Sequence, residues 1–204
     1  DLTVTGVQTC ALPILTYDNF KFFTIAQIKD LKDRTLTMNG VSKSYAMTGW
    51  RIGYGAGTKE IIKAMAKLQS QSTTNPSSIS QAAAVEALNG NQDFMLKRNQ
   101  SFKERRDFVV ETLNKIEGIS CLKPNGAFYV FPNCLKFLNK KDKTGKIIKN
   151  DSDFVNSLLE NYQVAVVQGS AFGLEGYFRI SYATSMDNLK KALDRISNFC
   201  KSLG

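Results

Sequence analysis

Lys43 and Arg51 are the residues whose types and spacing first suggest chemistry. Lys43 lies in a turn rich in small and hydroxyl residues, between two segments that we predict to be buried strands. A lysine withdrawn from water has a lowered pKa, and its neutral amine can attack an aldehyde. Arg51 follows eight residues later, and a guanidinium fork can grip two oxygens of a phosphate, which Gly49 and Gly53 would let approach the backbone. The pair predicts an amine nucleophile beside a phosphate clamp; two solvated surface charges are the alternative.

Arg179 is a second candidate for binding an anion. It lies in a strand-like run whose neighbours are mostly apolar, and a buried arginine needs an anionic partner. The alternative is an edge strand with Arg179 facing water.

Other nucleophile schemes find little support. The chain contains no histidine, which excludes Ser-His and Cys-His catalysis and histidine metal sites. Four cysteines are spaced neither for zinc nor for a disulfide framework, so we expect no metal and a reducing cytoplasm; they are Cys10, Cys121, Cys134 and Cys200.

Alternating predicted strands and helices give an α/β fold class. In the first part we expect strands at residues 35–40 and 51–56, a helix that Thr58 caps, a polar loop at 69–78 and a helix at 78–88 that stops at Gly90. A long helix over residues 92–117 would connect two domains. Beyond it we expect strands at residues 120–122, 127–131, 164–168 and 177–182, a basic surface insertion at 139–150, and helices at 153–162 and 186–202, the last capped by Ser185.

The composition describes an ordinary globular chain. Of its 204 residues 43% are hydrophobic and 22% charged, and no window has the ~18 consecutive apolar residues of a membrane span. The net charge of +9 is scattered and has no nucleic-acid-binding motif beside it, so we interpret it as a solvated surface and expect neither a nucleic acid nor a membrane as partner.

We do not expect the first fifteen residues to be part of the fold. They lack the basic start of a secretory signal, and Pro13 interrupts the short apolar run. Residues 4–14 resemble the translation of a common sequencing-adapter oligonucleotide. We therefore expect residues 1–15 to be an artefact, with other residues preceding Thr16 in the natural protein.

The segment around Lys43 resembles the S-K-x(5)-G-x-R-x-G signature of class I, or fold-type I, pyridoxal-phosphate aminotransferases, and the likeness extends from Thr16 to the C-terminus. In that family the lysine forms the internal aldimine with pyridoxal 5'-phosphate and shuttles the substrate proton. By this resemblance Lys43 is catalytic, Arg51 binds the cofactor phosphate, and Ser42 is a weaker candidate for the same phosphate.

Three further segments resemble the family. The F-R-I-S-Y-A run implies that Arg179 binds the substrate α-carboxylate, where a bidentate grip would orient the Cα–H bond. The P-N-G-A-F-Y run implies that Gly126 lines the substrate pocket, with a plain β-turn as the alternative. Residues 71–78 resemble a loop that reaches a neighbouring subunit, which implies a homodimer. Phe172 could line the substrate mouth, although we expect it to pack in the core.

The resemblance implies the C-terminal part of the pyridoxal-phosphate transferase fold. Residues 16–95 would be a remnant of the large mixed-sheet domain, and residues 96–204 the smaller α+β domain. The family's aspartate at the pyridine nitrogen, its asparagine and tyrosine at the phenolic oxygen, and its phosphate loop all precede the lysine, and we identify none of them here. We therefore expect this chain to be a fragment that is inactive alone.

Several functions remain open. The best match is to bacterial aspartate aminotransferases, which exchange amino groups between an amino acid and a 2-oxo acid. Some members select a dicarboxylate with an arginine in a loop that corresponds to residues 69–72, where this chain has none. Aromatic or prephenate aminotransferases, and a synthase or lyase on the same scaffold, are the alternatives, and a basic nucleic-acid-binding module is the alternative of another class.

Overall fold

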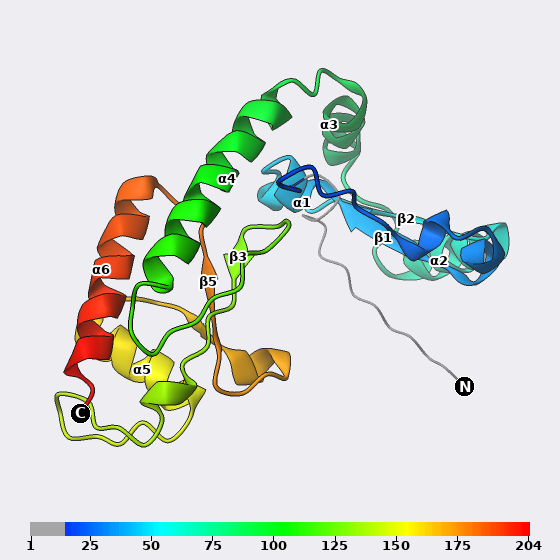
Figure 1. Cartoon of the computed structure of the whole chain (residues 1–204). Coiled ribbons are helices and arrows are strands. Elements are labelled where there is room, and N and C mark those ends of the chain that lie inside the picture. The colour runs from blue at the N-terminus through cyan, green and yellow to red at the C-terminus, as the bar shows by residue number, and fades with distance from the viewer. Residues whose placement is uncertain (1–14) are drawn as a thin grey trace. The chain divides into compact units, whose positions relative to one another are not determined.

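The structure, a computed structural model, describes residues 15–204; residues 1–14, and with them most of the predicted artefact, lie outside the described residues. The chain divides into two compact units, one ending at Lys97 and the other starting at Arg98. Helices and strands are mixed in both, as the α/β prediction requires (Figure 1). Among residues 15–204, no helix has the length and apolarity to cross a bilayer.

The first unit is built on an antiparallel hairpin. Strands β1 (Thr37–Gly40) and β2 (Gly53–Ala56) pair in a register that sets Gly40 opposite Gly53. A Cβ on Gly53 would lie 3.2 Å from the Asn39 carbonyl oxygen, so glycine at this position lets the two strands lie close together. The prediction that both strands are buried is wrong, because all four residues of β2 are exposed and Met38 is 66% exposed. No third strand joins this pair within the described residues, and an isolated hairpin has little to cover its faces.

Two helices follow the hairpin, α2 (Lys59–Ser72) and α3 (Ser78–Asn89). Helix α2 continues four residues into the predicted polar loop, because the Thr73 N–H bonds to the Gln69 carbonyl and completes a last turn; the loop shrinks to residues 73–77. Thr58 precedes α2 as predicted, but its side chain makes no capping hydrogen bond. Gly90 ends α3 as predicted.

Helix α4 (Phe94–Leu113) is shorter than the predicted helix over residues 92–117. Its end is set by Asn114, whose side-chain amide donates to the Cys121 carbonyl at 3.0 Å and accepts from the Cys121 N–H at 2.8 Å. These bonds turn the chain back, and Gly118 follows at φ 92°, a left-handed conformation that suits glycine. The boundary between the units falls within α4.

The second unit contains a three-stranded antiparallel sheet in the order β3-β5-β4, formed by β3 (Tyr129–Val130), β5 (Phe178–Ser181) and β4 (Val167–Gln168). These strands are shorter than predicted, and residues 120–122 contribute only an isolated bridge at Ser120. Ala127 has φ 64°, a left-handed conformation incompatible with strand, which explains why β3 starts only at Tyr129.

Helices α5 (Asp151–Tyr162) and α6 (Met186–Ser202) complete the second unit (Figure 1). Helix α6 has the predicted bounds, and the predicted cap is confirmed because Ser185 Oγ accepts from the Asn188 N–H at 3.2 Å. The core is aromatic: the Phe154 ring lies 5.1 Å from that of Phe178 and 5.0 Å from that of Phe199.

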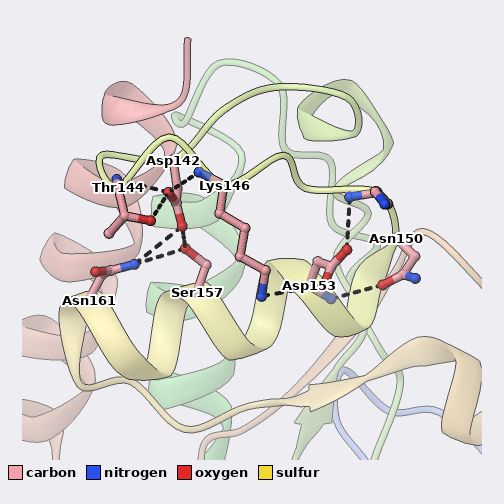
Figure 2. Close-up of polar contacts among 8 residues, drawn as sticks. Asp142, Thr144, Lys146, Asn150, Asp153, Ser157 and Asn161 are labelled. Atoms are coloured by element: carbon pink, nitrogen blue, oxygen red, sulfur yellow. Dashed lines mark hydrogen bonds and ion pairs between the residues drawn. The ribbon is translucent and has the colours of Figure 1, made fainter.

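Residues 139–150 lie mostly at the surface, as predicted, but a buried carboxylate anchors them. Asp142 is 6% exposed and accepts hydrogen bonds from Ser157 Oγ at 2.6 Å, from Thr144 Oγ1 at 2.6 Å and from the Lys146 N–H at 3.0 Å (Figure 2). These bonds, that from Ser157 first, lower the pKa of Asp142 to about 2. Ile148 is fully buried in the same segment. The sequence did not predict this buried aspartate, because the segment around it is rich in basic residues.

Replacing Asp142 with alanine is expected to destabilise the chain by about 2 kcal/mol at pH 7, because the fully buried Ser157 hydroxyl loses its acceptor. The folded pKa lies below the ~4 of an unfolded aspartate. The contribution is therefore complete above about pH 4 and is lost as the pH falls toward the folded value. Urea unfolding at several pH values measures both effects. Asp194→Ala, which removes an exposed carboxylate on α6, is the control, and an equal loss in both variants would contradict the anchor.

Candidate active site

Lys43 follows directly from strand β1. It lies in the short helix α1 (Val41–Ser44), where Val41 and Ser44 are buried and Lys43 is exposed. The prediction that Lys43 is withdrawn from water is therefore wrong for this chain, because the hairpin beside it is itself uncovered. Within residues 15–204 its amine has no hydrogen-bond or ion-pair partner, which leaves it available for reaction.

Arg51 stands out by its backbone. It follows the turn η3 (Thr48–Trp50) with φ 52° and ψ 49°, a left-handed conformation that is unfavourable for a long side chain. Strained residues of this kind concentrate at functional sites. Its Nη1 donates to the Thr48 carbonyl at 2.9 Å, and no carboxylate pairs with the exposed guanidinium among the described residues. A Cβ on Gly49 would meet nothing within 4 Å, so the space beside this turn is open.

A small apolar cluster holds the Lys43–Arg51 segment in place. Val41, Ile52 and Ala84 of α3 form this cluster, against which Tyr45 and Met47 pack. Lys43 thus lies two residues after Val41, and Arg51 immediately precedes Ile52. Lys43, Arg51 and the half-buried Ser42 all lie in the first unit, in the segment that this cluster anchors.

Arg179 lies at the centre of the second unit's sheet, on the middle strand β5. Its Cζ is 4.4 Å from the centroid of the Tyr129 ring and 4.3 Å from that of Phe172. Among residues 15–204 its guanidinium has neither a hydrogen bond nor an ion pair. Phe172 is 48% exposed, so the prediction that it packs in the core is wrong. Arg179 is a half-buried cation that lacks an anion.

Gly126 is buried in a loop that is fixed on both sides. Arg106 Nη1 donates to the Pro124 carbonyl at 3.0 Å, and the Tyr182 hydroxyl donates to the Ala127 carbonyl at 2.9 Å. Arg106 and Tyr182 are both fully buried, and the sequence reasoning overlooked them as supports of this loop. A basic residue on the inward face of an otherwise amphipathic helix was the available signal for Arg106.

Asp107 balances the charge of Arg106. Its Oδ1 lies 2.8 Å from Arg106 Nη2 and 3.0 Å from Lys123 Nζ, and Lys103 Nζ lies 3.1 Å from Oδ2. Partial burial raises the pKa of Asp107, but the bonds from Lys123, Lys103 and Arg106 outweigh it and lower the pKa to about 2. This network is structural, since it uses the donors of Arg106 internally.

The cysteines of the described residues are poor nucleophiles. Cys121, Cys134 and Cys200 are free and buried, and burial raises the pKa of the first to about 11 and of the other two to about 12. No group of three metal-ligating side chains occurs in residues 15–204.

A cavity in the second unit does not contain the candidate site residues. It has a volume of about 330 Å³ and lies among Val109 of α4, Ile180 of β5 and Leu189 of α6, without Arg179 or Gly126 in its lining. The predicted residues therefore form two groups: Ser42, Lys43 and Arg51 in the first unit, and Gly126 and Arg179 in the second.

Comparison with known proteins adds independent information. The family model described as aminotransferase class I and II matches residues 14–196. The chain is 60% identical over 190 residues to an aspartate aminotransferase of Rhizobium meliloti, covering 93% of the chain and 46% of the relative. It is 57% identical to a probable aspartate/prephenate aminotransferase of Rickettsia typhi, with 93% and 48% covered.

Solved structures agree. The crystal structure of the aspartate aminotransferase from Rhizobium meliloti superposes with a TM-score of 0.91 at 58% identity, covering 95% of this chain and 48% of that one. The aspartate aminotransferase from Thermotoga maritima gives a TM-score of 0.81 at 37% identity, with 95% and 47% covered. The chain thus spans about half the length of the relatives it matches.

Proposed function

The chain belongs to the class I and II aminotransferases, and from this premise we propose that its complete protein exchanges an amino group between an amino acid, first of all aspartate, and a 2-oxo acid. Pyridoxal phosphate is the cofactor of this family. The observation that carries the proposal is the anchored Lys43–Arg51 segment, in which, among residues 15–204, the Lys43 amine has no partner and the Arg51 guanidinium has no carboxylate.

The residues present fit the cofactor by their chemistry. A primary amine suits its aldehyde, and the Arg51 fork with the Ser42 hydroxyl suits its phosphate dianion. When bound, the cofactor supplies an electron-withdrawing ring that makes the substrate's Cα–H bond acidic. Lys43 would have two tasks: its amine would hold the cofactor, and in its free form it would carry the proton from the substrate Cα to the cofactor.

Arg179 has the complementary task of holding the substrate. Its unused N–H groups can donate two parallel hydrogen bonds to a carboxylate, which would fix the direction of the Cα–H bond. The buried backbone at Gly126, fixed by Arg106 and Tyr182, would form a wall of the same pocket.

Aspartate is proposed as the first substrate because the relatives named above carry that activity in their names. The side-chain carboxylate would need a cation other than an arginine at residues 69–72, where the sequence has none. Aromatic or prephenate aminotransferase activity remains the second candidate.

A homodimer is proposed for the complete protein. Leu68 and Ile79 flank the loop of residues 73–77, and their side chains are 74% and 72% exposed. Large apolar side chains on both sides of a polar loop suit a protein contact. We place the protein in the cytoplasm because the buried cysteines of the described residues are free thiols.

An amino-transfer assay tests the proposed function. The complete protein with pyridoxal phosphate, aspartate and 2-oxoglutarate is expected to form glutamate. The 204-residue chain alone is expected to form none, because it spans about half of its relatives and we identify in it no aspartate for the pyridine nitrogen.

The other outcomes identify the alternatives. Consumption of the amino acid in the absence of any 2-oxo acid would indicate a lyase or synthase instead of a transferase. Absence of any cofactor-dependent reaction, together with salt-sensitive DNA binding, would favour the basic binding module. Glutamate formation by the 204-residue chain would contradict its expected inactivity.

A further inference from the structure

Arg179 differs from Arg106 and Arg195, two other arginines of the second unit, in how its donors are used. The Arg106 guanidinium donates hydrogen bonds to Asp107 and to the Pro124 carbonyl, and Arg195 Nη1 donates to the Gln163 carbonyl at 3.3 Å. The Arg179 Cζ instead lies over two aromatic rings, which attract the cation and supply no oxygen acceptor for its N–H groups. Its position is thus fixed while its donors stay free.

The two rings reach Arg179 from opposite flanks of its strand. In the order β3-β5-β4, Tyr129 of β3 pairs with Ser181, which puts it diagonally next to Arg179 on the pleated surface. Phe172 belongs to the turn η5 (Gly169–Phe172) that follows directly from β4, on the other side of β5.

Both rings are set on rigid supports. The η5 turn is held by the buried Asp151, which accepts from the Ser170 N–H at 2.6 Å, and a Cβ on Gly169 would overlap the Leu174 carbonyl oxygen. Phe172 also packs edge-on against Phe131, with ring centroids 5.9 Å apart. Tyr129 is fixed by its pairing with β5 and follows the loop that Tyr182 anchors.

We propose that Tyr129 and Phe172 are positioning residues that hold the Arg179 guanidinium with its N–H edge open, so that the second unit binds a carboxylate in one orientation. This inference rests on the proposed function, in which Arg179 holds the substrate carboxylate. A long arginine side chain is flexible, and ordering it before the ligand arrives removes that entropic cost from binding. Because the rings accept no N–H···O hydrogen bond, the guanidinium keeps the paired donors with which a planar carboxylate makes two parallel bonds.

NMR of the 204-residue chain tests this proposal without the cofactor. The Arg179 Nε–Hε signal, assigned by its loss in Arg179→Lys, reports both side-chain order and binding of sodium acetate, with sodium chloride as the ionic control. In Phe172→Leu we expect lower Nε order, a shift of the signal away from its ring-current position, and roughly fivefold weaker acetate binding, which corresponds to the loss of one cation–π contact. Phe172→Tyr keeps a ring and should restore all three.

Phe20→Leu is the matched control, because Phe20 is 45% exposed, close to the 48% of Phe172, and lies in the first unit. Unchanged Nε order and unchanged acetate affinity in Phe172→Leu would overturn the positioning role, whatever the role of Arg179. An Arg179 signal that acetate fails to move in the parent chain would instead count against Arg179 as the carboxylate site, while the Nε order would still decide whether the rings hold it. Amide spectra confirm that each variant is folded.

Discussion

Replacing Lys43 with alanine in the complete protein is expected to lower the rate of amino transfer by about 10⁴-fold, because one residue supplies both the covalent hold on the cofactor and the proton transfer at Cα. The same variant should lose the lysine adduct that borohydride traps after incubation with pyridoxal phosphate. Peptide mass mapping of the trapped protein measures this directly, since the adduct must fall on the peptide that contains Lys43. An added primary amine should restore part of the proton transfer without restoring the adduct.

Lys59→Ala is the matched control for this prediction. Lys59 is an exposed lysine at the start of α2, in the same unit as Lys43 and outside the Lys43–Arg51 segment. It should keep both the adduct and the activity. An adduct that moves to another lysine while activity persists would reject Lys43 as the cofactor-binding residue.

The exposure of Lys43 has a consequence for the cofactor. The described residues leave Lys43 in contact with water. The chain also covers about half of each relative reported above. We therefore expect the trapped adduct to form far more slowly in the 204-residue chain than in the complete protein.

Local features of the fold were predictable from the sequence where the controlling residues are neighbours. Helix α6 has the predicted bounds because Ser185 caps it and Leu189, Leu193 and Ile196 follow at helical spacing on its buried side. Helix α4 was predicted too long because its end depends on Asn114 bonding to Cys121, seven residues away. The predicted strand lengths were wrong for a similar reason, since a strand extends only as far as the partner strand that it pairs with.

Burial was the weaker part of the site prediction. The strands around Lys43 have apolar residues, yet burial depends on what covers them, and no periodicity reveals a missing cover. Arg179 was identified by its motif, but its surroundings were not. Tyr129 and Phe172 meet it only through the strand order β3-β5-β4, and the sequence contains no local signal for that order.

Replacing Arg179 with lysine in the complete protein is expected to lower kcat/KM for aspartate by about 10²- to 10³-fold. The bidentate grip on the α-carboxylate would be reduced to a single bond, and a charge-assisted hydrogen bond contributes roughly 1.5–3 kcal/mol before the loss of orientation is counted. The residue lies in the second unit, whereas Lys43 and Arg51 lie in the first, so the cofactor adduct should form as in the parent protein. Steady-state kinetics and borohydride trapping separate the two effects.

The choice of substrate makes this last prediction specific to the carboxylate. 3-Aminopropanoate has the side-chain carboxylate of aspartate but no α-carboxylate, so Arg179 should favour aspartate over it in the parent protein and lose most of that preference in Arg179→Lys. Arg195→Lys, which changes an exposed arginine on α6 of the same unit, should leave the ratio unchanged. A ratio that is equal in the parent and in Arg179→Lys would mean that another group orients the substrate, and Arg179 would then be a structural cation held by its two rings.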